Sequence, residues 1–572
     1  MKIATLEINK WPRRKMIIPL VLAVANTMIK ELGFVELINK AVRWDRAHWN
    51  ISPGGLAKML VLSTFTDIRI PLTHLEDRLE TIDVEYFLDP DDKSTFVNSS
   101  NVGEALDRIG EIDYDGIYET LALSAIQTYK IPVTRLHDDT TTISFYGEYD
   151  LDKIDLTEKE KKELLHIERG YNKDGRPECK QTVVGQITNE YGIPLISRTL
   201  NGATSDIEWN QEAIRYAVQL ASEGFTHGIF VADSKLVIDK YVAEMNDPEK
   251  RLSFVSRCPA NFHEKLESRM IEAAYENDQW TDMGTFREGK AATQYKGASF
   301  TEEVCGAPVR LIVLESDTLK QKAELEFAKK ESGLAPIIKD LEKKQWMCLA
   351  DAEKERDRFL VMKQLDLFDC VVTIHKQTKE KWPRGRRRAD TKPKITETYH
   401  LRVERIEKSE SAYQEFLHRE SCIVLISNAF DEYSDDDLVR TYKGQQVVEN
   451  SFRMLKSPQL ASVIYLKDPK RIEVLGMILT FSLLLRALIQ FRLREGFKVF
   501  NEKNTGEKIY AGWGGRPLEN PTYKLFYEHS INCYFERENW MHYSFEWPSN
   551  ITRGRVESLL GLMGLSLELL LK

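Results

Sequence analysis

The stretch LHDDTTTISFYG, residues 136–147, places two adjacent aspartates inside a run that otherwise has the composition of a β-strand. Threonine, isoleucine and aromatic residues favour strands because their side chains pack well on a pleated surface. Side chains alternate between the two faces of a strand, so Asp138 and Asp139 point to opposite faces. A carboxylate beside apolar surface is costly unless it is paired or binds a metal. The two acids therefore need partners elsewhere in the chain.

The sequence around this strand predicts an α/β sheet. Three strands are followed by a helix, a strand, a helix and a final strand, an order typical of a ribonuclease-H-like fold. The second and third strands form a hairpin that turns at Gly192. The later strands and helices are predicted in HGIFVADS, LSFVSRC, SDIEWNQEAIRYAVQLA and LVIDKYVAEM.

The chain has 572 residues, which is too long for a single core. The predicted fold class is α/β, with a ribonuclease-H-like catalytic core interrupted by a strand-rich and partly helical insertion. Helical N- and C-terminal domains flank this core. The first of these domains suits either a helix-turn-helix DNA-binding and dimerisation unit or a simple packed bundle. The predicted segments are 1–130 (N-terminal helical), 131–260 (core, first part), 261–428 (insertion), 429–495 (core, with the glutamate-bearing helix and a buried helix) and 496–572 (C-terminal helical).

Composition excludes some classes of protein. The net charge is −9, so any nucleic-acid binding must come from local basic patches. Seven scattered cysteines without a C-x-x-C pair indicate reduced thiols and argue against a zinc site or a disulfide framework. The N-terminal residues show no secretory signal, so we expect a cytoplasmic, nucleoid-associated protein of a bacterium or archaeon. The apolar run 475–491 is interrupted by Arg486, which favours a buried core helix over a membrane span.

The predicted insertion contains two notable features. Two highly charged helical runs are expected to be separated at Gly333 and Pro336, because proline breaks helices. Residues 376–394 carry nine Lys and Arg residues together with Pro and Gly. This basic stretch is either a solvated linker or an arm that contacts phosphates, with Trp382 available to stack on a base. Its arginines are Arg384, Arg386, Arg387 and Arg388.

Two further carboxylates stand out. Asp233 ends the apolar strand GIFVADS, and ligand sites in α/β sheets favour strand ends. Glu449 lies in TYKGQQVVENSFRMLK, which is predicted to be helical. Three carboxylates suit a pair of Mg²⁺ ions about 3.5–4 Å apart, one activating the nucleophile and one stabilising the leaving oxygen. Mg²⁺ prefers such hard oxygen ligands.

The helix that carries Glu449 has a polar stripe. At about 100° per residue from Tyr442, Gln445 lies at about 300° and Glu449 at about 340°. Lys456 follows at about 320° and Arg453 at about 20°. A structural stripe would be apolar, so these side chains suit a catalytic and phosphate-binding face. A solvated helix face is the alternative.

Together these residues resemble the DDE transposases of bacterial insertion sequences, in the cut-and-paste group with a Tyr-Arg-Glu-Lys signature and a β-rich insertion domain. Tyr442, Gln445, Glu449 and Lys456 have the spacing of that signature, with Gln445 in place of the arginine. The resemblance covers roughly residues 130–490. Its motifs are LHDDTTTISFYGEY, GRPECKQTVVGQI, GIPLISRTLNGATSD, FVADSKL, FVSRCPAN and YKGQQVVENSFRMLK.

The resemblance implies a catalytic and metal-binding triad of Asp139, Asp233 and Glu449. Asp139 matches the family position better than Asp138, which is then an auxiliary or solvent-facing acid. The implied cofactor is Mg²⁺, with Mn²⁺ able to substitute. The implied DNA-binding residues are Tyr442, Gln445, Arg453, Lys456, Trp382, Arg384, Arg386, Arg387 and Arg388.

The resemblance also implies an activity and partners. The enzyme would cleave the ends of its insertion sequence and join the 3′ hydroxyl ends to target DNA. Its partners would be double-stranded DNA, as terminal inverted repeats and target, and a second copy of the chain on paired ends, without a membrane. A tryptophan of the insertion, with Trp280, Trp346 and Trp382 as candidates, would stabilise a flipped base. The alternatives are a metal-dependent nuclease without strand transfer and a catalytically silent DNA-binding relative.

Overall fold

The computed structural model describes residues 16–571 with several gaps. The gaps are 67–74, 151–156, 225–227, 249, 251, 287–291, 383, 385–391, 457–465 and 540–541. The chain forms two compact units. Unit 1 comprises Met1–Leu236, Asp247–Ser253 and Gly444–Lys572, and unit 2 comprises Val237–Asn246 and Phe254–Lys443.

Unit 1 contains four neighbouring strands in the order β4-β3-β2-β5. They are β2 (Arg135–Phe145), β3 (Lys180–Asn189), β4 (Pro194–Leu200) and β5 (Ile229–Val231). Strand β3 is antiparallel to β2 and to β4, whereas β5 is parallel to β2. The predicted β3–β4 hairpin is confirmed, and Gly192 adopts a φ of 76° in its turn, a value that glycine tolerates readily.

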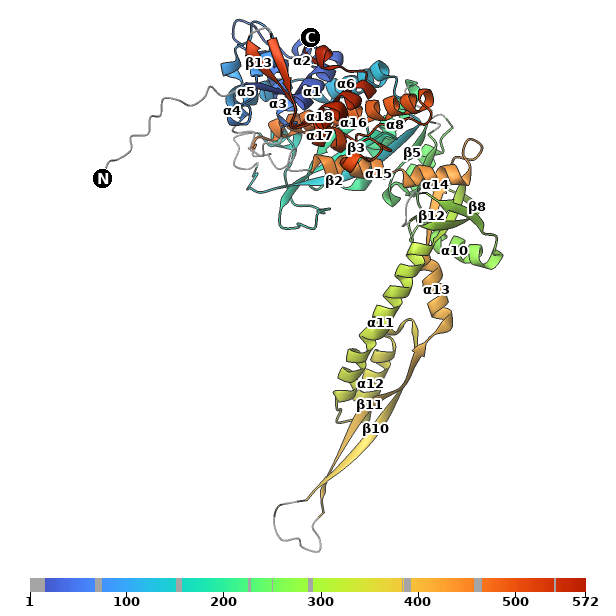
Figure 1. The fold of residues 1–572 in the computed structure, drawn as a ribbon. Helices are drawn as coiled ribbons and strands as arrows, with labels where there is room; N and C mark the ends of the chain where they lie inside the picture. Colours follow the sequence, from blue (N-terminus) through green and yellow to red (C-terminus); the bar gives the residue numbers. More distant parts are fainter. Residues whose placement is uncertain are drawn as a thin grey trace, which may run out of the picture. The chain divides into compact units, whose positions relative to one another are not determined.

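Helix α16 (Pro469–Lys503) is the central helix of unit 1. It contacts helices from both ends of the chain and strand β4 (Figure 1). It is the one helix in the described ranges that is long and apolar enough to cross a membrane, and 83% of its most apolar window is buried inside the protein. Its Arg486 is also buried, and the guanidinium donates to the carbonyl oxygens of Ser482 and Thr64 at 3.2 and 2.8 Å. The prediction of a buried core helix is confirmed.

The two ends of the chain meet in unit 1. Strand β1 (Ile17–Pro19) pairs with β13 (Tyr534–Asn539), which pairs in turn with β14 (His542–Glu546). The C-terminal segment, expected to be helical, therefore also contains two strands. The remaining helices of these segments are α1 (Leu20–Glu31), α2 (Phe34–Ala41), α3 (Pro53–Ser63), α4 (Leu75–Arg78), α5 (Ser99–Ile109), α6 (Tyr114–Tyr129), α17 (Tyr523–Ser530), α18 (Asn550–Leu562) and α19 (Leu567–Leu570).

Three more helices of unit 1 belong to the region of the four strands. They are α7 (Glu158–Glu163), α8 (Asp206–Ser222) and α15 (Gln446–Leu455). Helix α8 begins with a complete capping box, in which Ser205 and Glu208 each bond the other's backbone N–H. Both α8 and α15 contact β2.

Unit 2 contains five neighbouring strands in the order β6-β12-β9-β8-β7. Each neighbouring pair in this order is antiparallel. They are β6 (Phe254–Arg257), β7 (Thr281–Thr285), β8 (Gln294–Val304), β9 (Ala307–Ser316) and β12 (Cys422–Ser427). A separate hairpin pairs β10 (Phe368–Lys381) with β11 (Lys394–Lys408). The helices are α9 (Asp239–Met245), α10 (Leu266–Asn277), α11 (Asp317–Lys343), α12 (Leu349–Leu360), α13 (Glu410–Ser421) and α14 (Asp435–Lys443).

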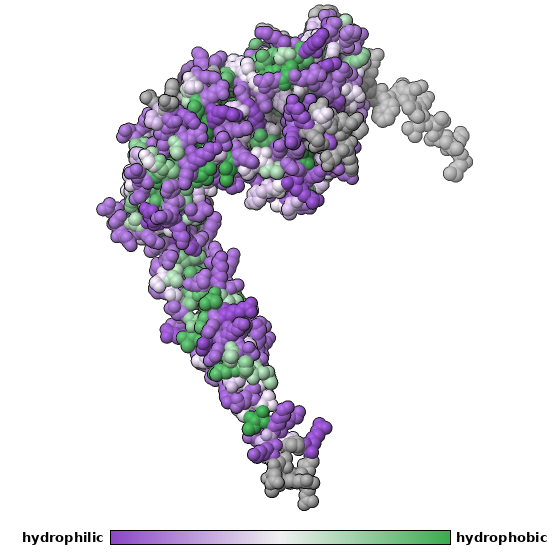
Figure 2. Space-filling view, turned by 180° about the vertical axis from the view of Figure 1, so that it is seen from behind, coloured by the Kyte–Doolittle hydropathy of each residue, from purple (hydrophilic) through white to green (hydrophobic). Residues whose placement is uncertain are grey.

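The β10–β11 hairpin lies beside α11 and α12 (Figure 1). They share an apolar core that includes Phe327, Leu334, Leu341 and Leu401. The outside of this region is mostly hydrophilic with small hydrophobic patches (Figure 2). The predicted helix break at Gly333 and Pro336 is wrong, because α11 continues through Pro336. Buried side chains before and after the proline attach the helix to this core, and this packing offsets a cost of about 3 kcal/mol.

The packing of α16 against α18 generates a first prediction. A Cβ added at Gly496 of α16 would lie 1.8 Å from the carbonyl oxygen of Leu562, whereas one added at Gly554 of α18 would meet nothing within 4 Å. We expect Gly496→Ala to lower the free energy of unfolding by about 1–3 kcal/mol through overpacking. Gly554→Ala should raise it by about 0.4–1 kcal/mol, because alanine restricts the unfolded chain.

Chemical denaturation of the full chain, followed by tryptophan fluorescence, measures both variants against the wild type. An unchanged midpoint for Gly496→Ala would contradict the close approach of α16 and α18.

Candidate functional site

The two aspartates of β2 lie in different environments. The Asp138 side chain points toward α8, where its Oδ1 accepts a hydrogen bond of 2.7 Å from Nε1 of the buried Trp209. Asp138 is only 1% exposed. Burial raises the pKa of Asp138 well above its usual value, against the opposing effect of the Trp209 bond. The interpretation of Asp138 as solvent-facing is therefore wrong, since the residue lies between the sheet and α8.

Asp139 points to the other face of the sheet. It lies opposite Gln186 in the antiparallel register of β2 and β3, and such pairs share a face. The side-chain oxygen of Gln186 accepts a hydrogen bond of 2.7 Å from Ser451 Oγ of α15. Asp139 therefore lies on the face of the sheet that α15 covers, and its side chain keeps 25% of its surface exposed.

Asp233 lies next to Asp139. Strands β2 and β5 are parallel with His137 opposite Val231, so two residues further along each chain the positions are Asp139 and Asp233. Burial raises the pKa of Asp139 to about 6, Lys173 opposes this rise, and the charge of Asp233 adds to it. Burial also raises the pKa of Asp233. A half-buried carboxylate within β2 and another just beyond the end of β5 form a site that favours an added cation.

Glu449 lies on α15, which is attached to the sheet on both sides of this residue. Before it, Gln445 Nε2 donates to the carbonyl oxygen of Asp138 at 3.2 Å. After it, Ser451 bonds Gln186 of β3. The glutamate is exposed between these two attachments. The helix that carries Glu449 thus contacts the strand that carries Asp139 (Figure 1).

Two lysines and a fourth carboxylate complete this cluster. Lys173 Nζ lies 3.5 Å from Asp139 Oδ1, 3.1 Å from Asp206 Oδ1 and 2.6 Å from Thr140 Oγ1. Asp206 also accepts hydrogen bonds from Lys235 and Thr140. Although burial acts to raise it, these bonds and the charge of Lys173 hold the pKa of Asp206 below its usual value. Lys173 therefore balances the negative charge of two acids.

The sequence interpretation did not identify these three residues. Lys173 precedes the quoted motif GRPECKQTVVGQI by two positions, Asp206 ends another quoted motif, and Lys235 follows Asp233 in FVADSKL. A lysine in a polar loop carries no sequence signal of its own, so only the fold reveals its contact with Asp139.

The predicted DNA-binding residues of the signature are divided between the units. Lys456 lies at the end of α15, and its Nζ pairs with Asp174 Oδ1 at 2.7 Å, so the loop holding Lys173 also contacts this helix. Arg453 is exposed on α15. Tyr442 lies on α14 of unit 2, before the division at Gly444.

The expectation of one continuous helix from Tyr442 to Lys456 is therefore wrong. Helix α14 ends at Lys443 and α15 begins at Gln446, with Gly444 and Gln445 between them. Glycine disfavours helix by about 1 kcal/mol, and the chain passes from one unit to the other at this point. The helical angles counted from Tyr442 do not apply beyond Gly444.

The basic stretch is only partly described. Trp382, 38% exposed, and the exposed Arg384 follow β10 in unit 2, whereas Arg386, Arg387 and Arg388 lie outside the described residues. The other two candidate tryptophans are also in unit 2. The Trp280 ring packs edge-on against Tyr275 at 5.2 Å between centroids, and the Trp346 backbone pairs with Tyr399.

The donor set of the carboxylate cluster suits Mg²⁺. Asp139 and Asp233 offer hard oxygen ligands, and exposed Glu449 lies on a helix that contacts β2, although in the described part of the chain the ligand atoms of these three carboxylates do not all lie within 4.8 Å of one another. The ammonium group of Lys173 already places one positive charge beside Asp139. The name "carboxylate cluster" here covers the four acids and the two lysines that pair with them: Asp139, Asp233, Glu449, Asp206, Lys173 and Lys235.

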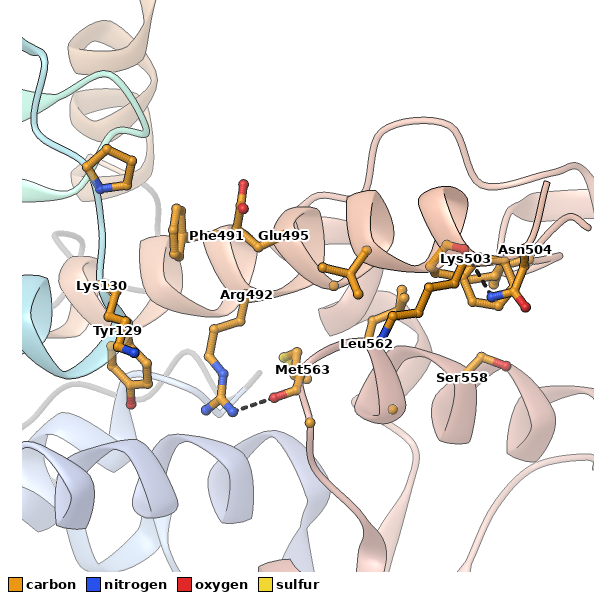
Figure 3. Close-up of a pocket in the computed structure, with 17 residues that line it drawn as sticks. Tyr129, Lys130, Phe491, Arg492, Glu495, Lys503, Asn504, Ser558, Leu562 and Met563 are labelled. Carbon is orange, nitrogen blue, oxygen red and sulfur yellow. Dashed lines mark hydrogen bonds between the residues drawn. The ribbon is translucent and has the colours of Figure 1, made fainter.

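A hollow elsewhere in unit 1 contains none of these residues. Its volume is about 890 Å³, and α6, α16 and α18 contribute to its lining (Figure 3). Arg492 reaches across it to donate to the carbonyl oxygen of Met563. The lining combines apolar residues with a few charges and brings no carboxylates together, so it offers no comparable chemistry.

Comparisons with known proteins match one family and several solved structures. Residues 18–123 match a family described as "Domain of unknown function (DUF4277)". A solved structure, titled a cryo-EM structure of piggyBac transposase synaptic complex with hairpin DNA, is similar at a TM-score of 0.36 and 10% identity. That match covers 96% of this chain and 82% of the other. No curated protein matches the chain.

Proposed function

We propose that this protein is a DNA transposase that cleaves the ends of an insertion sequence and joins the 3′ hydroxyl ends to target DNA. The observation that carries the proposal is the placement of Asp233, two residues beyond the end of β5, near enough to Asp139 of the neighbouring strand β2 for its charge to act on that residue, while the helix that carries Glu449 also contacts β2. Burial raises the pKa of both Asp139 and Asp233, and perturbed pKa values cluster at functional sites.

The course of the chain supports a ribonuclease-H-like core with an insertion. Asp233 and Glu449 are 216 residues apart (449 minus 233), yet both belong to unit 1. Nearly all of the intervening residues form unit 2. The strand order β4-β3-β2-β5, with β5 parallel to β2, also suits the predicted core.

In this proposal Asp139, Asp233 and Glu449 hold Mg²⁺, for which Mn²⁺ can substitute. Two such ions supply activation of the attacking water or 3′ hydroxyl and stabilisation of the leaving oxygen. Gln445 and Ser451 hold α15 so that Glu449 faces the reacting phosphate. Lys173 and Lys235 hold Asp206 and limit the repulsion among the acids.

The proposed partner is double-stranded DNA, both as terminal inverted repeats and as target. Arg453 and Lys456 of α15 lie on the helix of Glu449 and are suited to phosphate oxygens. In the family pattern the position of Gln445 is an arginine, and here its amide bonds the backbone of β2 instead. Tyr442, Trp382 and the arginines of residues 384–388 supply further DNA contacts. A homodimer holding two DNA ends completes the proposal.

The decisive test compares the two neighbouring aspartates. The test substrates are duplexes that end in the inverted repeats found in the DNA on either side of the gene. We expect Asp139→Asn to reduce their cleavage by more than about 100-fold, because it removes a charge needed in the transition state. Asp138→Asn is the matched control. An asparagine oxygen can still accept the Trp209 bond, so cleavage should stay within about tenfold of wild type.

The measurement uses purified protein, Mg²⁺, labelled duplexes and a supercoiled target plasmid. Cleavage at the repeat boundary together with joined product, both lost in Asp139→Asn, is the expected result. Cleavage without joining would replace the transposase with a nuclease. DNA binding without either product would identify a catalytically silent relative, and loss of cleavage in Asp138→Asn alone would move the catalytic role to Asp138.

A second prediction concerns phosphate contact by α15. Arg453→Ala should weaken DNA binding and reduce the salt dependence of the binding constant by about one unit of slope, as expected for the loss of one phosphate contact. Arg553→Ala is the control, since this exposed arginine pairs with Glu557 at 2.8 Å on α18. Fluorescence anisotropy at several salt concentrations measures both slopes. Equal slopes for the wild type and Arg453→Ala would exclude Arg453 from the DNA interface.

A further inference from the structure

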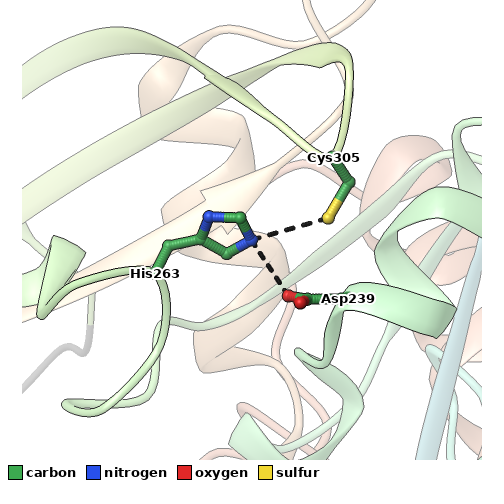
Figure 4. A group of neighbouring side chains, drawn as sticks. All are labelled: Asp239, His263 and Cys305. Atoms are coloured by element: carbon green, nitrogen blue, oxygen red, sulfur yellow. Dashed lines mark hydrogen bonds and ion pairs between the residues drawn. The ribbon is translucent and has the colours of Figure 1, made fainter.

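Three metal-ligating side chains meet in unit 2, and none of them belongs to the carboxylate cluster. Asp239 begins α9, His263 precedes α10, and Cys305 lies in the turn between β8 and β9 (Figure 4). His263 Nε2 lies 2.9 Å from Asp239 Oδ1 and 3.6 Å from Cys305 Sγ. One ligand atom from each residue lies within 4.8 Å of the other two. We propose that Asp239, His263 and Cys305 bind one Zn²⁺ ion.

The distances suit tetrahedral zinc. With Zn–N of about 2.0 Å and Zn–S of about 2.3 Å, tetrahedral angles separate the nitrogen from the sulfur by about 3.5 Å. The observed distance between His263 Nε2 and Cys305 Sγ is 3.6 Å. The corresponding separation of nitrogen and oxygen is about 3.3 Å, so Asp239 needs to move by only a few tenths of an ångström from its hydrogen bond. Three protein ligands leave the fourth position to water.

The geometry does not suit a cysteine nucleophile activated by histidine. In such an arrangement the two ring nitrogens divide the work, one contacting the thiol and the other the carboxylate. Here both Asp239 and Cys305 approach the same atom, Nε2 of His263 (Figure 4). A single nitrogen cannot relay a proton between them, but it can share a metal ion with both.

The backbone conformations of Cys305 and His263 support a functional role for these two residues. Cys305 and Gly306 form the two-residue β8–β9 turn with φ values of 54° and 76°, as a type I′ turn requires. Asn-Gly is the preferred pair in such turns, so cysteine at the first position is conformationally unfavourable. His263 also has a positive φ, 39°. Positive φ values are uncommon for cysteine, whereas histidine is one of the residue types that adopt them more often, and Glu264 and Lys265 after His263 share this conformation.

The proposed ion would connect three segments of unit 2. Asp239 belongs to the short segment Val237–Asn246, which is followed by Asp247–Ser253 of unit 1. His263 is 24 residues from Asp239, and Cys305 is 42 residues from His263. The scattered cysteines, without a C-x-x-C pair, predicted no zinc site. The proposed ligands are far apart in sequence and come together only in the folded chain.

The test uses the full chain after removal of metals with a chelator. Zn²⁺ is titrated by calorimetry with Mg²⁺ in excess, and Co²⁺ is titrated to detect the charge-transfer absorption of a thiolate ligand. We expect one Zn²⁺ per chain with a Kd of about 1 µM or tighter, weaker than four-ligand structural sites. Cys305→Asn should weaken binding by more than about 100-fold and remove the Co²⁺–thiolate band.

The same substitution controls for misfolding. Asn-Gly suits the β8–β9 turn, so Cys305→Asn should keep or raise the thermal stability of the metal-free protein. His263→Asn should likewise lose the ion, because it removes the imidazole ligand. The variant should still fold, because asparagine tolerates a positive φ. Cys348→Ser is the matched control, because Cys348 is an exposed cysteine 3.0 Å from Asp351 Oδ2 and serine can still cap α12. It should bind Zn²⁺ as the wild type does, and so should Asp139→Asn.

Absence of Zn²⁺ binding at about 10 µM in the wild type would overturn the proposal. So would full binding by Cys305→Asn, which would place the ion on other residues. Because the readouts are metal binding and absorption, they do not depend on DNA cleavage.

Discussion

Strand β2 has a helix on each of its faces, and this constraint decides what its acidic residues can do. On one face Trp209 of α8 donates to Asp138 and removes it from solvent. On the other face α15 is attached through Gln445 and Ser451, at either side of Glu449. The first helix buries an acid by filling the space around it, whereas the second covers its face incompletely and leaves Asp139 partly accessible. The alternation of side chains along β2 thus separates a structural acid from an accessible one, although the two are adjacent in sequence.

Ion pairs connect Lys173 and its loop both to strand β2 and to helix α15. Lys173 contacts two acids from a loop, and its neighbour Asp174 pairs with Lys456 at the end of α15. The loop therefore links the carboxylates of the sheet to the helix that covers them. In the other unit, His263 and Cys305 lie close together and both have positive φ values. Both places keep polar groups close together at a cost in stability, which is typical of functional sites.

The local pattern of the sequence predicted much of the fold. Alternating apolar residues and turn glycines located the β3–β4 hairpin, and the long apolar run located the core helix α16. Position within the predicted sheet singled out Asp233 and the pair that includes Asp139, and their catalytic role stays a prediction. The same reasoning failed where tertiary packing competes with local preference. Pro336 lies inside α11 because apolar residues on both sides pack into one core, and Gly444 ends α14 where the chain passes between units. The environment of Asp138 and the contacts of Lys173 depend on residues distant in sequence, which no local pattern contains.

The position of unit 2 within the chain has a consequence for the order of synthesis and folding. Asp139 and Asp233 emerge from the ribosome long before Glu449, and at about 5–20 residues per second the 216 residues between Asp233 and Glu449 require about 11–43 s. The N-terminal helices of unit 1 wait longer still, because α16, against which they pack, begins only at Pro469. A partly synthesised chain therefore has neither the complete set of acids nor the central helix of its first unit. Any activity of the carboxylate cluster must therefore begin only after Glu449 and helix α16 have been made.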